Sequence, residues 1–175
     1  MLSVYLDNMI ACAITERDLA NGEQKSLDEL VTIEKRRDKI RFQISDEAQR
    51  EVERTRDQQK RERLKAGISQ IESVQESSKL RGFNIQDLGR YGFMSSPLLS
   101  EVLDPAMLAQ LATLGFERSD SIHFINAVCN KCDVFLTTDP RFMQHRPELE
   151  CLYQQIVIRK PSALLAELLG TISRG

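Results

Sequence analysis

The chain has 175 residues, 41% of them hydrophobic and 29% charged, which is the ordinary composition of a globular protein with one domain, residues 1–175. The net charge of −2 argues against a protein that coats nucleic acid by bulk electrostatics, although an acidic nuclease site needs negative charge only locally. No apolar run is long enough for a membrane span, and the start lacks the basic region and cleavage site of a signal peptide. We therefore expect a cytoplasmic protein with no membrane partner.

Residues 1–44 predict two strands and two helices. A short apolar run ends at Asp7, and a helical stripe of apolar residues begins directly after it. Ser26 and Glu29 have the spacing of a capping box at the start of the second helix. We expect strands at residues 2–6 and 40–44 and helices at residues 9–14 and 26–38.

A charged helical arm and a loop region follow, at about residues 46–97. The pattern predicts a long helix over residues 45–65 that resumes after Gly67 through residue 74. Basic residues outnumber acidic ones in its second half, so the arm is a candidate contact for a phosphate backbone; a solvated helix with many ion pairs is the alternative. Glycines and serines in residues 77–97 predict a loop.

Residues 120–139, DSIHFINAVCNKCDVFLTTD, are the most informative segment. Ile122, Ile125 and Val128 recur at a spacing of three, which predicts a helix with one buried face. The apolar and β-branched run that follows predicts a buried strand over residues 133–138, which Pro140 ends because it has no N–H to donate. Elsewhere in this half we expect helices at residues 98–103, 106–114 and 161–169 and a strand at residues 156–158.

This order of elements predicts an α/β fold with a parallel sheet covered on both faces. Right-handed crossovers bring the carboxyl ends of such strands to one rim, where open α/β sheets carry their sites. Asp7 and Asp139 each follow a predicted strand, so we expect both at that rim.

Four acids are placed to converge near this rim. Two carboxylates about 4 Å apart repel by roughly 4 kcal/mol at an effective dielectric of 20, so such a cluster requires protons or cations. Mg²⁺ or Mn²⁺ prefers oxygen ligands and keeps several waters, which suits hydrolysis of phosphodiester bonds. The four candidate residues are Asp7, Glu51, Asp120 and Asp139.

Each acid also has a structural interpretation. Asp7 and Asp120 have the position of helix N-caps, and Asp139 that of the first residue in an Asp-Pro turn. Glu51 fits a partly buried helix position. Asp133 opens its strand at the opposite rim, and we expect it to be structural.

The four cysteines do not indicate a zinc site. Cys129 and Cys132 form one CxxC, but the chain has no second CxxC, and its only histidines are His123 and His145. Cys12 and Cys129 also lie on apolar helical faces, where a reduced cysteine packs as a small hydrophobe.

Three blocks of the chain resemble the signature blocks of PIN domains, which are metal-dependent nucleases. The blocks are YLDN at residues 5–8, ISDEAQRE at residues 44–51 and the segment of residues 120–139. The resemblance spans most of the chain, and the third block is the most specific. It implies a three-layer α/β/α fold with a central parallel sheet.

The resemblance also implies roles for individual residues. Thr137 would help to shape the site, whereas Asn8 stands where the family often has Thr or Ser. Glu47, one helical turn before Glu51, is a rival for the second acid. The implied catalytic residues and ligands of Mg²⁺ or Mn²⁺ are Asp7, Glu51, Asp120 and Asp139.

The family's usual activity is Mg²⁺- or Mn²⁺-dependent cleavage of RNA. Many small members are toxins of toxin–antitoxin pairs and often dimeric, so the resemblance implies an RNA substrate, an antitoxin partner and a homodimer as expectations. The charged region of about residues 46–97 exceeds the smallest toxins of this kind. This departure weakens the toxin assignment more than the nuclease assignment.

Two other enzyme classes fit poorly. A haloacid-dehalogenase-like phosphatase needs a second Asp two residues after the first, where this chain has Met9. A receiver domain needs an acid pair after its first strand, but Leu6 and Met9 flank Asp7. The main alternative is a catalytically inactive PIN-like domain that serves as a binding or scaffold module, because fold does not guarantee function.

Overall fold

Five parallel strands form one sheet in the order β3-β2-β1-β4-β5 in the computed structural model, which describes residues 1–36, 39–73 and 104–172. The chain adds strands outward on one side of β1, then crosses back to add β4 and β5 on the other side. The direction of strand addition therefore reverses between the neighbouring strands β1 and β4. This is the switch point of the sheet, where ligands of open α/β folds bind. The strands are β1 Leu2–Leu6, β2 Ile40–Ile44, β3 Glu72–Ser73, β4 Val134–Leu136 and β5 Val157–Arg159.

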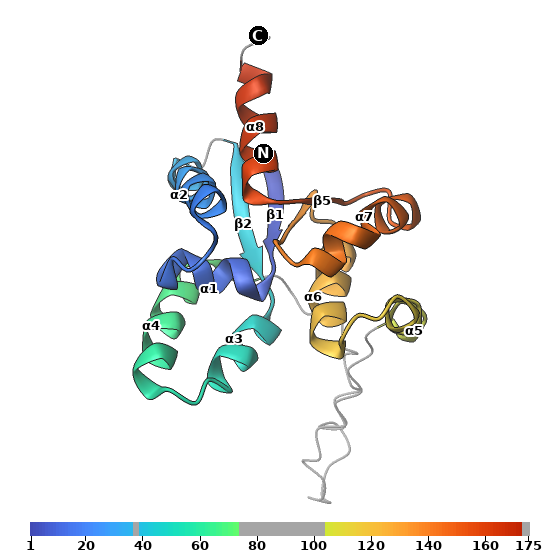
Figure 1. Ribbon diagram of the computed structural model, residues 1–175, viewed down its shortest axis with the longest axis horizontal. Coiled ribbons are helices and arrows are strands. Elements are labelled where there is room, and N and C mark those ends of the chain that lie inside the picture. Colours follow the sequence, from blue (N-terminus) through green and yellow to red (C-terminus); the bar gives the residue numbers. More distant parts are fainter. Residues whose placement is uncertain (37–38, 74–103, 173–175) are drawn as a thin grey trace, which may run out of the picture.

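Helices cover both faces of the sheet, so the expected three-layer α/β/α architecture is confirmed (Figure 1). The first layer holds α1 Asn8–Glu16, α2 Asn21–Lys35, α3 Asp46–Glu53, α4 Gln58–Ile68 and α8 Pro161–Ile172. The second layer holds α5 Pro105–Thr113, α6 Arg118–Cys129 and α7 Pro140–Leu152.

The central strands are buried on both faces. Val4 and Leu6 of β1 pack into the core beneath the first layer, whereas Tyr5 between them packs into the core beneath the second. All three side chains are fully buried. This alternation follows from the pleat of the strand, which directs successive side chains to opposite faces. Among the described helices, none has the combined length and apolar character that a membrane crossing requires.

The charged region does not form one long helix as predicted. It breaks after α3, and α4 begins anew at Gln58, because the Asp57 carboxylate accepts a hydrogen bond from the Lys60 backbone N–H (2.9 Å) and caps a second helix. The predicted continuation beyond Gly67 is also wrong. The chain there enters β3, an edge strand that pairs in parallel with β2.

Two further boundaries differ from the sequence prediction. The capping box at Ser26 is wrong, because α2 begins at Asn21 and the Ser26 hydroxyl donates to the Gly22 carbonyl (3.0 Å) within the helix. Helix α7 was not predicted, because Pro140 was interpreted only as the end of a strand. Pro140 is the first residue of α7, a position where its missing N–H costs nothing. The predictions for residues 77–97 and 98–103, and the helix end at residue 38, lie outside the described residues.

A close approach between α1 and α4 requires glycine at position 67. A Cβ atom there would lie 1.9 Å from Thr15 Oγ1 and 3.3 Å from Thr15 Cβ. We expect Gly67→Ala to lower the free energy of unfolding by about 1–3 kcal/mol through overpacking, despite the higher helix propensity of alanine. Urea unfolding measures this change.

Two variants control this prediction. Adding Thr15→Ala to Gly67→Ala removes the clashing hydroxyl and should restore most of the lost stability. Gly22→Ala, where no atom lies within 4 Å of the added Cβ, should not destabilise the protein. Equal stability of Gly67→Ala and the wild type would contradict the inferred packing.

Candidate functional site

The site begins at Asp7, the residue that follows β1 and caps α1. Its Oδ1 atom accepts a hydrogen bond from the Asn8 backbone N–H (2.7 Å), and the residue is only 7% exposed. Burial raises the pKa of the Asp7 carboxyl, although His123, Thr137 and the Asn8 N–H oppose the shift. Helix capping is therefore one role of Asp7, but it leaves Oδ2 facing the end of β4.

Thr137 joins Asp7 to Asp139. The pairing of Leu6 with Leu136 places Asp7 and Thr137 side by side at the carboxyl ends of β1 and β4. The buried Thr137 hydroxyl donates to Asp7 Oδ2 (2.7 Å) and accepts from the Asp139 backbone N–H (3.0 Å). One hydroxyl group therefore fixes the spacing of the two acids at the switch point.

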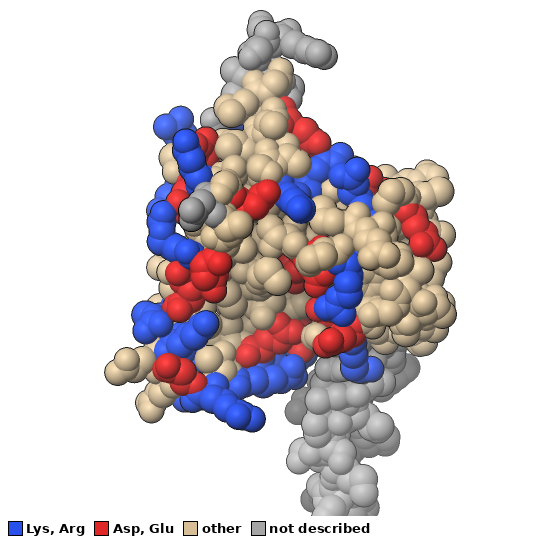
Figure 2. All heavy atoms as spheres, viewed as in Figure 1, with Lys and Arg blue, Asp and Glu red and all other residues tan. Residues whose placement is uncertain are grey.

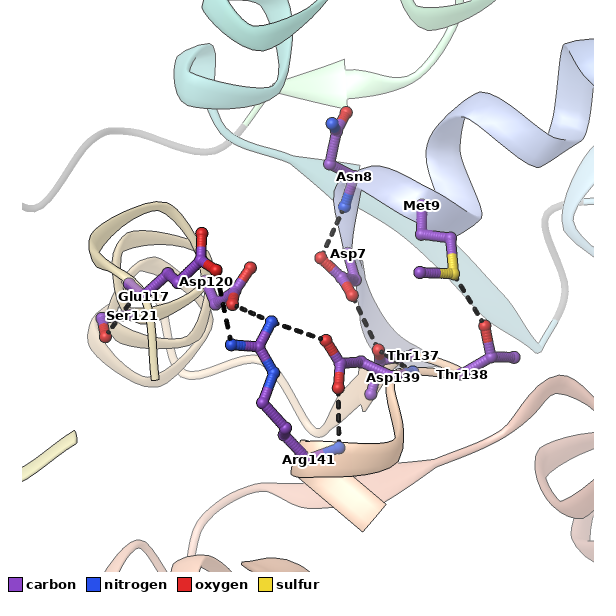
Figure 3. A network of polar contacts seen from close by, with 10 residues as sticks. All are labelled: Asp7, Asn8, Met9, Glu117, Asp120, Ser121, Thr137, Thr138, Asp139 and Arg141. Atoms are coloured by element: carbon purple, nitrogen blue, oxygen red, sulfur yellow. Dashed lines mark hydrogen bonds and ion pairs between the residues drawn. The ribbon is translucent and has the colours of Figure 1, made fainter. Parts of the chain in front are cut away.

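Asp139 caps α7 rather than forming an isolated Asp-Pro turn. Its Oδ1 atom accepts from the Arg141 backbone N–H (2.7 Å). This bond leaves Oδ2 for other partners. Figure 3 shows the carboxylate of Asp139 close to that of Asp7, with both at the ends of neighbouring strands.

Asp120 approaches the other two acids from α6. It lies in the first turn of that helix, whose N-cap is Glu117, so the N-cap interpretation of Asp120 is wrong. Burial raises the pKa of Asp120; Arg141 lowers it, and the charges of Asp7 and Asp139 raise it further. The structure thus brings three of the four predicted acids to one place (Figure 3).

Arg141 is the cation at this place, and sequence analysis did not identify it. Its Nη2 atom lies 2.8 Å from Asp120 Oδ2 and 3.3 Å from Asp139 Oδ2. Its Nη1 atom lies 3.8 Å from Glu117 Oε1. The sequence signal for this role was the position of a basic residue, Arg141, two residues after Asp139, the last of the four acids.

Glu51, the fourth predicted acid, reaches the cluster through His123. The Glu51 Oε2 atom lies 3.4 Å from His123 Nε2, an ion-pair distance without the geometry of a good hydrogen bond. Burial alone lowers the pKa of His123, but the negative charges of Glu51 and Asp7 outweigh it, and the net shift is upward. His123 therefore interacts with the charges of both Glu51 and Asp7, and both interactions favour its protonated form.

Two buried hydroxyl groups hold the His123 ring in place. The Tyr5 hydroxyl lies 2.9 Å from His123 Nδ1 and donates to Ser45 Oγ (2.7 Å). With its proton directed to Ser45, the Tyr5 oxygen accepts from Nδ1–H, so Nε2 carries a proton only in the imidazolium form. His123 entered the sequence-based predictions only as one of two histidines that do not complete a zinc site, and Tyr5 and Ser45 had no predicted role.

Glu47, the rival of Glu51, is paired elsewhere. Its carboxylate is almost fully buried and lies 3.1 Å from Arg50 Nη1 and 3.2 Å from Arg54 Nη1. Glu51 instead faces His123 across the contact of α3 with α6. Two arginines thus neutralise Glu47, and Glu51 is the acid directed toward the cluster.

The other residues considered in the sequence do not join the acid cluster. The Asn8 side chain points away from the three aspartates, and its Oδ1 atom accepts from Cys12 Sγ at 3.5 Å (Figure 3). Cys129 is exposed and Cys132 is buried, both as free thiols. Asp133 lies at the opposite end of β4, where its carboxylate accepts from the Ser3 backbone N–H (2.7 Å).

The donor chemistry of the cluster fits a hard divalent cation. Asp7, Asp120 and Asp139 supply carboxylate oxygens, the ligands that Mg²⁺ and Mn²⁺ prefer. Within the described parts of the chain, however, no three His, Cys, Asp or Glu side chains are close enough to hold a metal ion as they stand. The guanidinium of Arg141 lies between Asp120 and Asp139, so closure around an ion requires this side chain to move.

Charge is distributed unevenly around the cluster. On the face shown in Figure 2, acidic side chains gather in the lower middle of the molecule, and Lys and Arg side chains border them. Positively charged side chains therefore lie beside the acids on this face despite the net charge of −2.

The fold has a counterpart among solved structures. One chain of a crystal structure described as VapBC2 from Rickettsia felis, bound to a DNA fragment from their promoter, superposes with a TM-score of 0.54. The match covers 90% of this chain and 98% of that chain at 12% sequence identity. The fold is PIN-like. No protein-family model and no curated protein match the chain.

Removing the buried charge of Asp7 should stabilise the protein when no divalent cation is present. Asn retains the cap of α1, and its amide can keep the contact with Thr137, whose hydroxyl both donates and accepts. We expect Asp7→Asn to raise the free energy of unfolding at pH 7 by on the order of 1 kcal/mol. Urea unfolding in EDTA measures the difference.

The pH dependence of this stability difference follows from the direction of the Asp7 pKa shift. Because the pKa of Asp7 is raised in the folded state, its charge costs stability above the folded pKa. The cost disappears as the pH falls through the folded pKa toward the unfolded value of about 3.9. The free energies of unfolding of the wild type and Asp7→Asn should therefore become equal in acid. Asp133→Asn, which removes a carboxylate from an exposed position at the opposite end of β4, serves as the control. Lower stability of Asp7→Asn at pH 7 would show that the Asp7 charge is compensated.

The buried hydroxyl of Tyr5 should contribute more to stability than that of Tyr153. Tyr5→Phe leaves Ser45 and His123 Nδ1 without their shared partner in a buried position, which should cost roughly 1–3 kcal/mol. Tyr153→Phe removes a bond to Gln110 that is only partly buried and should cost less than about 1 kcal/mol. Chemical denaturation compares the two variants, and equal losses of stability would argue against a stabilising buried polar network around His123.

Proposed function

We propose that the chain is a Mg²⁺- or Mn²⁺-dependent endoribonuclease. The observation that carries this proposal is the Thr137 hydroxyl, which joins Asp7 and Asp139 at the switch point, opposite Asp120. Asp7 and Asp139 each cap a helix, but capping uses one oxygen of each and does not account for their convergence with Asp120, and burial raises the pKa of both Asp7 and Asp120. The PIN-like fold and the PIN-like motifs agree with this interpretation.

In this proposal Asp7, Asp120 and Asp139 hold the cation. The bound cation supplies an activated water and stabilises charge on the phosphoryl oxygens. Thr137 positions two of the ligands through its two hydrogen bonds. Glu51 adds negative charge behind the cluster, where its Oε2 atom lies 3.4 Å from His123 Nε2.

We further propose RNA as the substrate and an antitoxin-like protein as a partner. Basic side chains at the border of the acids would contact the phosphates of RNA. The similarity to a chain of the VapBC2 complex and the PIN-like motifs support a protein partner of the antitoxin kind. A homodimer remains a further proposal, and sedimentation velocity tests it.

A catalytically inactive binding module is the second candidate. The observation in its favour is Arg141, which already supplies a positive charge to Asp120 and Asp139. In that case the cluster would be a closed ion-pair network, and divalent cations would not bind.

Thermal shift with metal distinguishes the two candidates. Millimolar Mn²⁺ or Mg²⁺ should raise the melting temperature of the wild type by several degrees, because an ion that binds only the folded state stabilises it by mass action. Asp139→Asn should abolish the shift. Asp133→Asn, at the opposite end of β4, should retain it.

Cleavage assays complete the test. Wild-type protein with Mn²⁺ should cut single-stranded RNA, and Asp139→Asn should lose the activity by at least about a hundredfold. The absence of a metal-dependent shift would favour the binding module. Cleavage of duplex DNA with RNA spared would overturn the proposed substrate.

A further inference from the structure

Arg141 is held across two acids by a single nitrogen atom. Nη2 contacts Oδ2 of Asp120 and Oδ2 of Asp139, while the backbone N–H of the same arginine donates to Oδ1 of Asp139 (Figure 3). The Arg141 side chain is 41% exposed, whereas those of Asp120 and Asp139 are 22% and 13% exposed. The arginine therefore covers the solvent side of the two carboxylates.

Helix electrostatics do not explain this placement. Arg141 is the second residue of α7, and the amino end of a helix carries partial positive charge that disfavours a cation. A basic residue in this turn is stabilised by the acids it contacts rather than by its own helix. The acid cluster, not α7, therefore determines the position of the guanidinium.

Arg141 and a divalent cation compete for the same oxygens. A divalent cation held by Asp120 and Asp139 would need the carboxylate oxygens that Nη2 of Arg141 now contacts. Both positive groups cannot occupy this space. The Arg141 side chain is 41% exposed and contacts both acids through Nη2 alone, so the guanidinium can turn into solvent when an ion takes its place.

We propose that Arg141 has two positions: it occupies the cation position between Asp120 and Asp139 in the metal-free protein and, once displaced, binds a phosphate of the RNA substrate. This inference rests on the proposed nuclease function. The guanidinium presents a planar fork of donors that matches phosphate oxygens. Because Arg141 lies in the first turn of α7, its guanidinium stays near the acids even after it leaves the space between Asp120 and Asp139.

Metal binding without substrate tests the first position. Arg141→Gln should bind Mn²⁺ roughly threefold to tenfold more tightly than the wild type, because the ion no longer displaces a paired charge. Titration followed by electron paramagnetic resonance of free Mn²⁺ measures this affinity. Arg146→Gln removes the same charge from an exposed position of the same helix, and should change the affinity much less. Equal affinities of Arg141→Gln and Arg146→Gln would overturn the proposal.

Steady-state cleavage of a short single-stranded RNA at saturating Mn²⁺ tests the second position. We expect Arg141→Gln to raise KM roughly tenfold or more through loss of a charged hydrogen bond, with a smaller effect on kcat. Arg141→Lys keeps the charge without the planar fork, so its KM should lie between those of the wild type and Arg141→Gln. An unchanged KM in Arg141→Gln would overturn the phosphate-binding position.

Failure of the nuclease proposal and failure of the Arg141 proposal give different results. If the wild type and Arg141→Gln both bind no Mn²⁺, the nuclease proposal itself is wrong. If both bind Mn²⁺ equally and Asp139→Asn does not, the nuclease proposal stands and the role of Arg141 is overturned.

Discussion

The structure of the site depends on the hydrogen bonds of one buried hydroxyl. Thr137 donates to Asp7 and accepts from the backbone of Asp139, and so connects the carboxyl ends of β1 and β4. Register alone would place Asp7 beside Thr137, but it would not fix the direction of the Asp7 carboxylate. With Oδ1 bound to the start of α1 and Oδ2 bound to Thr137, the Asp7 carboxylate has a single orientation.

Two basic side chains contact the acids at this end of the sheet. Arg141 contacts Asp120 and Asp139 from the solvent side, whereas the His123 ring faces Glu51 within the protein. The buried His123 ring is oriented by Tyr5, which is bound in turn to Ser45. The partly exposed Arg141 side chain has fewer buried partners, so it can change position more easily than His123.

The charged helices α3 and α4 support this arrangement from one side. Arg50 and Arg54 neutralise Glu47, which leaves Glu51 as the α3 acid that faces α6. Asp57 ends the continuity of the charged region by starting α4, and Gly67 lets that helix approach α1 closely. The break therefore permits α3 to lie against α6 while α4 packs on α1.

The sequence alone determined the parallel α/β fold and the positions of Asp7 and Asp139 after their strands, because strand periodicity and chain order limit the connections a parallel sheet can have. It did not predict α7, because Pro140 ends a strand and begins a helix equally well. The sequence also did not predict the roles of Arg141, His123 and Tyr5. Their roles depend on partners 21 to 118 positions away along the chain, such as Asp120 for Arg141 and Tyr5 for His123. Local pattern determines which elements form, whereas pairing between distant buried charges is decided only when the layers pack together.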